Sequence, residues 1–440
     1  MKRFYGRELE LGVLNDLYNK VETKAQMTVI TGRRRLGKTV LSLEHSKNKD
    51  SLYLFVSKKS EILLCEEFTA LIEQQFNVPV LGKITQFKDV FELVLQLAQK
   101  QKIVLVVDEF QEFFNINPAV YSELQYLWDM YKHKSKIHLI FIGSVYSLMN
   151  KIFQGSKEPL FGRADRMIYL KPFKPDVLKN ILKDAKQYSC ENLFYNYVIT
   201  GGVPRYQELL FDNGCFSKNE IMDFIFQKDS PFLLEGQNLL ISEFGKEYGT
   251  YFSILELLSE GKTARSEIES IMNKNAGGFL DRLEKDYDVI EKYKPIGAKS
   301  GSKNQKYRIK DNFLRFWFRF VYKYRSVIET ENFTYIKRIL KRDFSTFCGF
   351  ALERLFYDMV CMSGDYNLIG SYWERGNLNE LDLVAVNDLD KTVLIGECKL
   401  NAKKISLSEV EFKAKKLKEM YEGYAFSFKG FSTEAIDDWI

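Results

Sequence analysis

The first part of the chain alternates between two hydrophobic patterns. Short apolar runs occur near residues 27–31, 52–57, 103–107, 138–143 and 167–170. Stretches with helical spacing of apolar residues, such as Glu61 to Phe76 and Phe87 to Lys100, lie between them. Short runs of this kind are typical of strands buried on both faces, as in a parallel sheet. The alternation therefore predicts an α/β fold, a three-layer sheet domain over residues 1–172.

The pattern changes after this domain and predicts three more. Helical periodicity runs from Pro175 to about Phe232, which predicts a helical lid over residues 173–240. Three short amphipathic helices and a basic hairpin, Pro295 to Tyr307, then predict a winged helix over residues 241–325. A helical connection, about 326–345, leads into a last domain over residues 326–440, where helix and strand patterns predict a second α/β fold.

A complete G-x-x-x-x-G-K-[ST] motif lies between the first apolar run and a helix-like stretch. Gly32 and Gly37 allow the backbone to curl, so that successive N–H groups point at the phosphates of a nucleotide. Lys38 would neutralise the outer phosphates, and the hydroxyl of Thr39 would complete the Mg²⁺ shell. The motif therefore predicts a P-loop that binds ATP and Mg²⁺ through Gly32, Arg33, Arg34, Arg35, Leu36, Gly37, Lys38, Thr39 and Val40.

Two carboxylates follow the apolar run Ile103 to Val107 and cannot contribute to its burial. Asp108 is placed to hold Mg²⁺, and Glu109 to orient and deprotonate the attacking water. The pair therefore predicts that the nucleotide is hydrolysed as well as bound, so the chain would be an ATPase. Ser144, which ends a later apolar run, either senses the γ-phosphate or caps the next helix, and the sequence leaves both roles open.

Composition excludes several classes of protein. The 440 residues are 45% hydrophobic with mixed charge, which indicates a folded protein. No apolar run reaches the roughly 18–20 residues that span a bilayer, and the beginning does not resemble a secretion signal. The six cysteines show no paired spacing, which favours thiols in a reducing compartment. We therefore expect a cytoplasmic protein without a membrane partner.

The net charge of +5 is small, so any contact with nucleic acid must come from a local patch. One basic patch lies between Ile290 and Lys310, where Glu291 is the only acid before Lys310. Its basic residues are Lys292, Lys294, Lys299, Lys303, Lys306, Arg308 and Lys310. The patch predicts that the winged helix contacts DNA. Winged helices also serve as spacers and dimerisation units, and this alternative stays open.

Carboxylates and a lysine recur in the last domain. Glu353 lies in an apolar helix, Asp382 in a strand, and Glu397 and Lys399 at the end of a second strand. Residues two apart on a strand share a face, so Glu397 and Lys399 project together. If the strands pair, Asp382 lies beside Glu397, and a divalent metal would relieve the repulsion between them. Glu380 is a competing choice for the strand acid. Such a site could activate water towards a phosphodiester, with Lys399 countering charge or orienting the nucleophile.

A set of motifs occurs in a fixed order along almost the whole chain. They read FYGRELE at the start, then GRRRLGKT, VVDEFQEF, IGSVYSLM, PLFGRADR, GGVPRY and FLRFWFRF. In this order they resemble the archaeal-type ATPases within the STAND branch of the AAA+-like P-loop proteins. The tail of such proteins resembles the PD-(D/E)XK nuclease fold.

The resemblance implies further roles for individual residues. Gly6 and Arg7 would lie near the adenine and the ribose. Arg163 or Arg166 would approach the γ-phosphate, in the same chain or from a neighbouring subunit of a homo-oligomer. Pro204 would contact the nucleotide from the lid.

For the tail, the resemblance places Glu353, Asp382, Glu397 and Lys399 at the metal and catalytic positions of the nuclease fold. The strand motif reads ELD, so no proline precedes the acid. We therefore predict an ATP-hydrolysing switch coupled to a metal-dependent DNA nuclease-like domain. A regulatory ATPase scaffold, whose C-terminal domain only binds nucleic acid or a protein partner, is the alternative. An ATP-fuelled remodelling motor, which would need a ring of subunits, is a third class.

Overall fold

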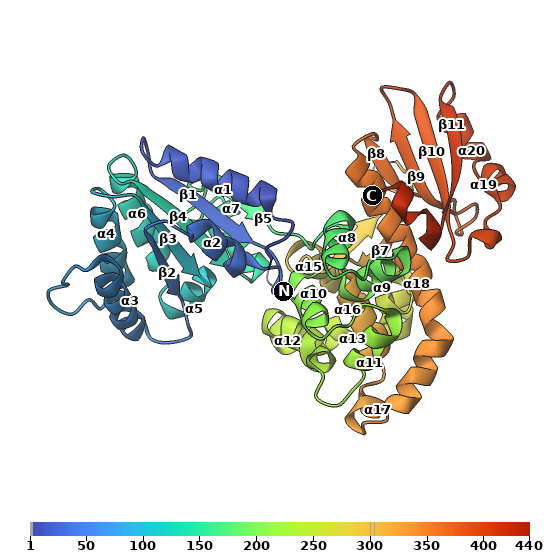
Figure 1. The fold of residues 1–440 in the computed structure, drawn as a ribbon. Coiled ribbons are helices and arrows are strands. Elements are labelled where there is room, and N and C mark those ends of the chain that lie inside the picture. Colours follow the sequence, from blue (N-terminus) through green and yellow to red (C-terminus); the bar gives the residue numbers. More distant parts are fainter. Residues whose placement is uncertain (1–2, 300, 303) are drawn as a thin grey trace. The chain divides into compact units, whose positions relative to one another are not determined.

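A computed structural model describes residues 3–299, 301–302 and 304–440, so Lys303 of the basic patch lies outside the described residues. The chain divides into two compact units (Figure 1), one ending at Lys171 and the other running from Pro172 to Ile440. No helix among the described residues combines the length and the apolar character that crossing a bilayer requires.

The first unit is built on a parallel sheet of five strands in the order β2-β3-β4-β1-β5. The strands are β1 (Gln26–Thr31), β2 (Ser51–Phe55), β3 (Ile103–Asp108), β4 (Ile137–Gly143) and β5 (Arg166–Tyr169). Every residue of the three central strands β3, β4 and β1 is buried, as expected from their continuous apolar runs. The α/β fold with a parallel sheet is thus confirmed.

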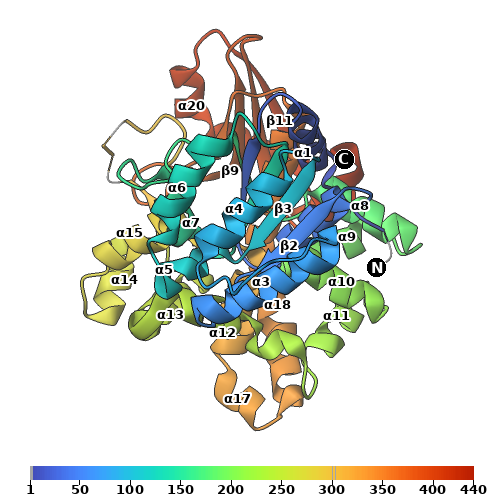
Figure 2. The ribbon, with the colours of Figure 1, turned by 90° about the vertical axis from the view of Figure 1, so that its left-hand side faces the viewer.

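Helices cover both faces of this sheet. They are α1 (Glu8–Lys20), α2 (Lys38–Ser46), α3 (Glu61–Phe76), α4 (Phe87–Leu97), η1 (Phe110–Glu112), α5 (Phe113–Ile116), α6 (Val120–Tyr131) and α7 (Tyr146–Gln154). Helices α3, α4 and α6 lie over one face (Figure 2), where their apolar side chains form one core with alternate residues of the strands. Because the carboxyl ends of parallel strands meet at one edge, this layered packing brings the turns after β1, β3 and β4 together there.

The second unit begins with helices, as the periodicity predicts. They are α8 (Pro175–Asp184), α9 (Cys190–Thr200), α10 (Pro204–Asp212), α11 (Lys218–Ile225), α12 (Pro231–Phe244), η2 (Gly245–Glu247), α13 (Tyr248–Ser259), α14 (Arg265–Met272) and α15 (Gly277–Lys285). An antiparallel hairpin of β6 (Ile290–Tyr293) and β7 (Lys306–Ile309) follows α15. Its assignment as part of a winged helix, and the four domain boundaries, stay predictions.

Aromatic residues after the hairpin form a buried helical segment that leads into a long helix. The segment consists of α16 (Asn312–Phe316), the π-helical η3 (Trp317–Tyr322) and α17 (Arg325–Glu329), and the long helix is α18 (Phe333–Ser363). The side chains of Phe313, Phe316, Phe318 and Phe320 are fully buried, so they belong to a core.

The chain ends in a separate mixed sheet with the order β11-β10-β9-β8. Its strands are β8 (Leu368–Tyr372), β9 (Leu381–Asn387), β10 (Thr392–Cys398) and β11 (Ala425–Phe431). The short helices are η4 (Ala402–Lys404), α19 (Leu407–Lys413), α20 (Lys415–Met420) and η5 (Thr433–Asp438). Helices α19 and α20 pack their apolar residues on one face, and α18 packs on the sheet through Phe356, which stacks on Phe431. The second α/β fold is therefore confirmed.

Candidate functional site

The G-x-x-x-x-G-K-[ST] motif forms the turn between β1 and α2. Gly32 and Gly37 have φ of +142° and +81°, which favours glycine at both positions. A Cβ atom at Gly32 would lie 2.7 Å from the carbonyl oxygen of Leu170, so no larger residue fits there without a backbone shift. Arg35 also has a positive φ, of 72°. The loop therefore has the curled shape that a phosphate-binding turn needs, and it leads directly into the N-terminus of α2.

The Lys38 side chain lies inside this turn. Its ammonium donates hydrogen bonds to the carbonyl oxygens of Gly32, at 2.7 Å, and Arg33, at 2.9 Å. Leu36 is buried, while Val40 on α2 is exposed. The lysine is thus held at the loop, within reach of any anion that the loop binds.

Asp108, at the end of β3, contacts the motif directly. Its Oδ2 accepts hydrogen bonds from the hydroxyls of Thr39, at 2.6 Å, and Tyr53, at 2.7 Å. Its Oδ1 accepts a hydrogen bond from the backbone N–H of Glu109 at 2.8 Å. Burial, together with the bond to Asp108, raises the pKa of the Tyr53 phenol. Hydroxyl and carboxylate oxygens are the ligands that Mg²⁺ prefers, so Thr39 and Asp108 fit such an ion.

Glu109 adopts a left-handed backbone conformation with φ of 53°, which non-glycine residues adopt at some energetic cost. Its Oε2 accepts hydrogen bonds from the Ser144 hydroxyl, at 2.8 Å, and from the Gln111 side-chain amide. The N-cap of α7 is Val145, so Ser144 does not cap that helix. Tyr53 and Gln111 were not among the residues predicted from the sequence.

Arg7 is buried and contacts the phosphate loop through the backbone of Leu36. Its guanidinium donates to the carbonyl oxygens of Leu36, at 3.2 Å, and Lys171, at 2.7 Å, and forms an ion pair with Glu10 at 3.3 Å. Gly6, which precedes it, has φ of 60°. The predicted contacts of Gly6 and Arg7 with adenine and ribose stay predictions, as does the role of Pro204, which begins α10 in the second unit.

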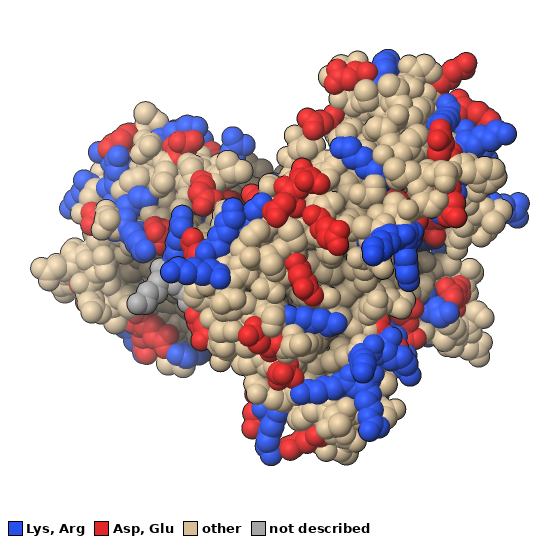
Figure 3. Space-filling view, turned by 45° about the vertical axis from the view of Figure 1, so that its right-hand side comes forward, with Lys and Arg blue, Asp and Glu red and all other residues tan. Residues whose placement is uncertain are grey.

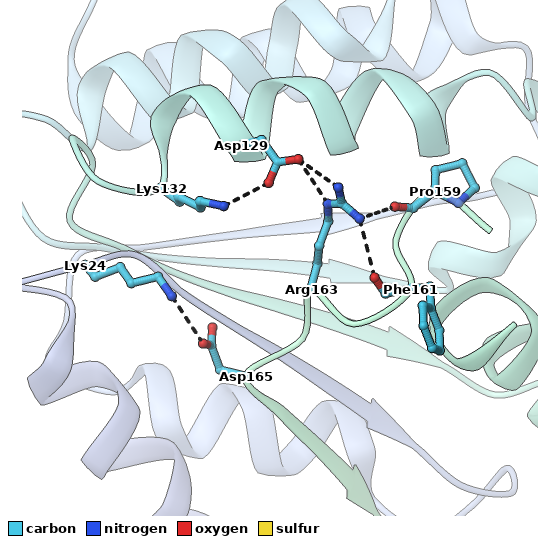
Figure 4. Close-up of polar contacts among 7 residues, drawn as sticks. All are labelled: Lys24, Asp129, Lys132, Pro159, Phe161, Arg163 and Asp165. Carbon is cyan, nitrogen blue, oxygen red and sulfur yellow. Dashed lines mark hydrogen bonds and ion pairs between the residues drawn. The ribbon is translucent and has the colours of Figure 1, made fainter. Parts of the chain in front are cut away.

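Arg163 and Arg166 lie at the other edge of the sheet. The Arg163 guanidinium donates to Oδ2 of Asp129 at 2.8 Å and to the carbonyl oxygens of Pro159 and Phe161 (Figure 4). Arg166 begins β5, where it pairs with Thr28. At ~3.3 Å per residue it is roughly 10 Å along the strand from the end of β1. Neither arginine lies at the phosphate loop of its own chain. The alternative in which a neighbouring subunit supplies the arginine stays a prediction.

Three of the four predicted tail residues converge at the ends of β9 and β10. The antiparallel register pairs Leu383 with Gly396, so one residue further Asp382 lies opposite Glu397. Asp382 Oδ2 accepts a hydrogen bond from the backbone N–H of Cys398 at 2.8 Å. Lys399 Nζ lies 2.7 Å from Glu397 Oε1 and 3.6 Å from Asp382 Oδ2.

Glu397 is buried, with 7% of its surface exposed, and its Oε2 has no hydrogen-bond partner among the described residues. A buried carboxylate oxygen of this kind is costly unless a cation or donor meets it. The Asp382–Glu397 pair therefore fits a divalent cation through hard oxygen ligands. Within the described residues, however, no three His, Cys, Asp or Glu side chains are close enough to form a complete metal-binding group.

Glu353 comes near this pair from α18. Burial, and next the charge of Asp382, raise the pKa of the Glu353 carboxyl to about 8. Burial also raises the pKa of Asp382, with Glu397 contributing. The competing acid, Glu380, is exposed and forms an ion pair with Lys306 at 2.9 Å. Asp382, and not Glu380, is thus the acid that contacts Lys399.

Much of the basic patch is neutralised within the chain. The ion pairs are Lys292–Glu284, Lys306–Glu380, Arg308–Glu291 and Lys310–Asp288. Acidic and basic side chains are also interspersed over the surface seen in Figure 3. DNA binding by a winged helix therefore stays a prediction.

Two family models match the chain. A model described as an ATPase domain predominantly from Archaea matches residues 4–210. A second model, for archaeal and bacterial proteins of unknown function, matches residues 317–416. The first match contains all the residues of the phosphate loop and of the β3 and β4 ends.

The uncharacterized protein MJECL04 of Methanocaldococcus jannaschii is 30% identical over 409 residues, which cover 90% of this chain and 87% of that protein. Among solved structures, the Walker-type ATPase PABY2304 of Pyrococcus abyssi has a TM-score of 0.56 at 17% identity, covering 72% of this chain and 96% of its own. The ORC2 protein of Aeropyrum pernix has a TM-score of 0.52 at 13% identity, covering 75% and 95%. At these identities the two structures establish a shared P-loop ATPase fold.

Proposed function

Because the chain belongs to the family of ATPase domains found predominantly in Archaea and is an ATPase, we propose that it is a nucleotide-dependent switch coupled to a metal-dependent DNA nuclease. The convergence of Lys399 on Asp382 and Glu397 is the observation that carries the nuclease half. The coupling is motivated by the presence of both sites in one chain.

The phosphate loop supports the binding of ATP in this proposal. Backbone N–H groups between Gly32 and Gly37, with the N-terminus of α2, surround the phosphates. The Lys38 ammonium exchanges its carbonyl partners for phosphate oxygens. Thr39 and Asp108 hold Mg²⁺, which neutralises part of the phosphate charge.

Hydrolysis depends on Glu109. Its carboxylate takes the proton of the attacking water, and the hydrogen bond from Ser144 fixes its orientation. In this proposal Ser144 also responds to the γ-phosphate. Gly6, Arg7 and Pro204 complete the nucleotide site, while Arg163 or Arg166 of a neighbouring subunit approaches the γ-phosphate.

The tail site acts on a phosphodiester. Asp382 and Glu397 hold a divalent cation, which lowers the pKa of a water molecule and stabilises the charge of the transition state. Lys399 counters charge beside them or orients the nucleophile. Glu353, whose carboxyl is near Asp382, helps to shape the site from α18.

DNA cleavage with Mg²⁺ or Mn²⁺, with and without ATP, tests the nuclease half. Wild type is expected to cleave, and Asp382→Ala to lose cleavage because one carboxylate of the pair is gone. Glu380→Ala is the matched control, since it removes a nearby exposed acid and is expected to cleave like wild type. Equal cleavage by wild type and Asp382→Ala would reject Asp382 as a metal ligand.

A regulatory ATPase scaffold is the second candidate. It is favoured by the lack of a complete three-ligand metal group among the residues that the structure describes. In this case the tail binds DNA or a protein without cleaving, and wild type and Asp382→Ala bind DNA equally and cleave none. A remodelling motor would form rings with ATP, which light scattering would detect.

A further inference from the structure

The hairpin β6–β7 does not project freely from the second unit. The backbone N–H of Ile296, in the loop after β6, donates to the carbonyl oxygen of Ser371 in β8 at 2.9 Å. The side chain of Ile296 is buried in the same core as Leu381 and Val384 of the tail sheet. Since β8 is an edge strand, the hairpin loop covers part of that edge.

The end of the hairpin next to its loop, where Tyr293 pairs with Lys306, reaches the neighbourhood of the carboxylates. Lys306 pairs with Glu380 and lies 4.4 Å above the ring of Trp373, whose indole N–H donates to Asn304 at 2.9 Å. Tyr293 packs against the same Trp373, with ring centroids 5.5 Å apart. The hairpin therefore forms one wall beside the strand end that carries Asp382.

Arg315, between the hairpin and α18, adds a cation to this region. Its guanidinium donates to the carbonyl oxygen of Phe347 at 2.8 Å and lies 4.4 Å and 5.2 Å from the rings of Phe347 and Phe350. Burial lowers its pKa to about 10, and Glu353 is the carboxylate that acts on it most strongly. Yet no ion pair joins Arg315 to any carboxylate among the described residues, whereas Arg319, one turn later, pairs with Asp343 at 2.8 Å.

The charge of Arg308, in β7, acts on Arg315, and Arg308 shares its carboxylate partner with a second arginine. It pairs with Glu291 at 2.6 Å, and Glu291 is also bound by Arg354 at 2.9 Å. If Arg308 turned towards a ligand, Glu291 would keep its other arginine. Guanidinium groups bind phosphate through two parallel hydrogen bonds, and a partly desolvated guanidinium is stabilised by an anion.

We propose that Arg315 and Arg308 hold the phosphodiester backbone of a DNA strand beside Asp382 and Glu397, so that the hairpin and the tail form one DNA-binding site. This inference rests on the proposed nuclease function, because it names the residues that position the substrate of that site. In this inference the hairpin contacts DNA together with the carboxylate site, and not as part of a winged helix that binds DNA independently of the tail. Both arginines are positioning residues, which hold the phosphodiester backbone of the DNA.

Binding of fluorescein-labelled DNA oligonucleotides to the full chain tests the inference, with Ca²⁺ in place of Mg²⁺ to prevent cleavage. Fluorescence anisotropy is expected to show about tenfold weaker binding for Arg315→Gln, the loss of roughly one charge-assisted contact. The slope of log Kd against log salt should fall by about one. Arg308→Gln should weaken binding in the same direction and carries the test if Arg315→Gln unfolds, which circular dichroism would reveal.

The matched control is Arg282→Gln on α15, the helix that a freely reading winged helix would use. Arg282 is partly exposed and paired with Glu247, and its removal should leave DNA binding unchanged. The inference is overturned if wild type binds no DNA, or if Arg282→Gln weakens binding while the Arg315 and Arg308 variants bind normally. If DNA binding depends on the two arginines but wild type does not cleave DNA, the proposed nuclease activity is refuted and this inference stands. If wild type cleaves DNA and both Arg315→Gln and Arg308→Gln bind DNA normally, this inference is refuted and the proposed nuclease activity stands.

Discussion

At the scale of single residues, the two neighbouring acids after β3 have different partners and therefore different expected roles. Asp108 accepts hydrogen bonds from Thr39 and Tyr53, so it is tied to the loop and to the proposed Mg²⁺. Glu109 has a left-handed backbone conformation, and its side chain accepts a hydrogen bond from the Ser144 hydroxyl. The two carboxylates can thus be separated by mutation, one affecting metal-dependent binding and the other affecting hydrolysis.

Glu109→Gln should retain ATP binding and lower the rate of hydrolysis by roughly 10²–10⁴-fold, because the amide cannot accept the proton of water. Phosphate release and equilibrium binding of ATP measure the two properties separately. Glu112→Gln, in the following turn, is the control and should hydrolyse ATP normally. A Glu109→Gln protein with the wild-type rate would contradict the role of this residue as base.

The residues that the sequence missed at this site depend on contacts between elements. The sequence pattern indicates only that Tyr53 belongs to an apolar strand. The pairing of β2 with β3 brings its hydroxyl to Asp108. Gln111 contacts Glu109 because the chain turns sharply after β3. Nor could periodicity choose between Asp382 and Glu380, since the choice depends on where β9 begins and on Lys306, 74 residues earlier.

At the scale of elements, the turn between β1 and α2 depends on glycine at its first position. Gly32→Ala should weaken ATP binding at least about tenfold, because the new Cβ would meet the Leu170 carbonyl and φ of +142° is strained for alanine. Gly12→Ala in α1 is the matched control, since nothing lies within 4 Å of its Cβ position. That change should leave binding unaffected and raise stability slightly. Normal ATP binding by Gly32→Ala would contradict the tight turn.

A second element-scale feature is a buried chain of histidines that links β1, β4 and α2. Thr28 Oγ1 lies 2.9 Å from His138 Nε2, and His138 Nδ1 lies 3.2 Å from His45 Nε2. Burial, with the nearby charge of Lys49, lowers the pKa of His45 to about 3 and that of His138 well below its usual value. Both rings are therefore neutral in the folded state at neutral pH.

This chain predicts a loss of stability in acid. The unfolded rings titrate near their usual pKa of about 6.5, so their contribution is complete above that pH and falls as the pH drops below it. At pH 5 the loss should be about 2 kcal/mol for each histidine. Hydrogen exchange of β1 and β4 amides, corrected for intrinsic rates, measures it. His133→Gln, which removes an exposed ring, should leave the pH profile unchanged, and a flat wild-type profile would contradict the prediction.

Helices, strands and loops could be predicted from the sequence where the residues that determine them lie close together in the chain. The five strands and the phosphate loop follow from apolar runs, glycines and a motif within one short segment. The helical connection predicted near residues 326–345 continues into the helix of Glu353, because α18 runs through Gly349 without interruption over 31 residues. The docking of the hairpin could not be predicted either, since it depends on Ile296 and Ser371, which are 75 positions apart in sequence.

At the scale of the whole molecule, the chain contains an ATPase unit and a second unit with the carboxylate site. The central claim is that the nucleotide state of the first controls DNA cleavage by the second. In this account ATP binding orders the lid and hydrolysis at Glu109 resets it. Glu109→Gln should therefore hold the protein in the ATP-bound state.

The most direct test is the rate of DNA cleavage by wild type and Glu109→Gln, measured with Mg²⁺ in the presence and absence of ATP. ATP is expected to change the cleavage rate at least about fivefold. Glu109→Gln should keep the ATP-induced rate long after wild type has consumed its ATP and returned to the nucleotide-free rate. The absence of cleavage, or rates that are the same with and without ATP in both proteins, would contradict it.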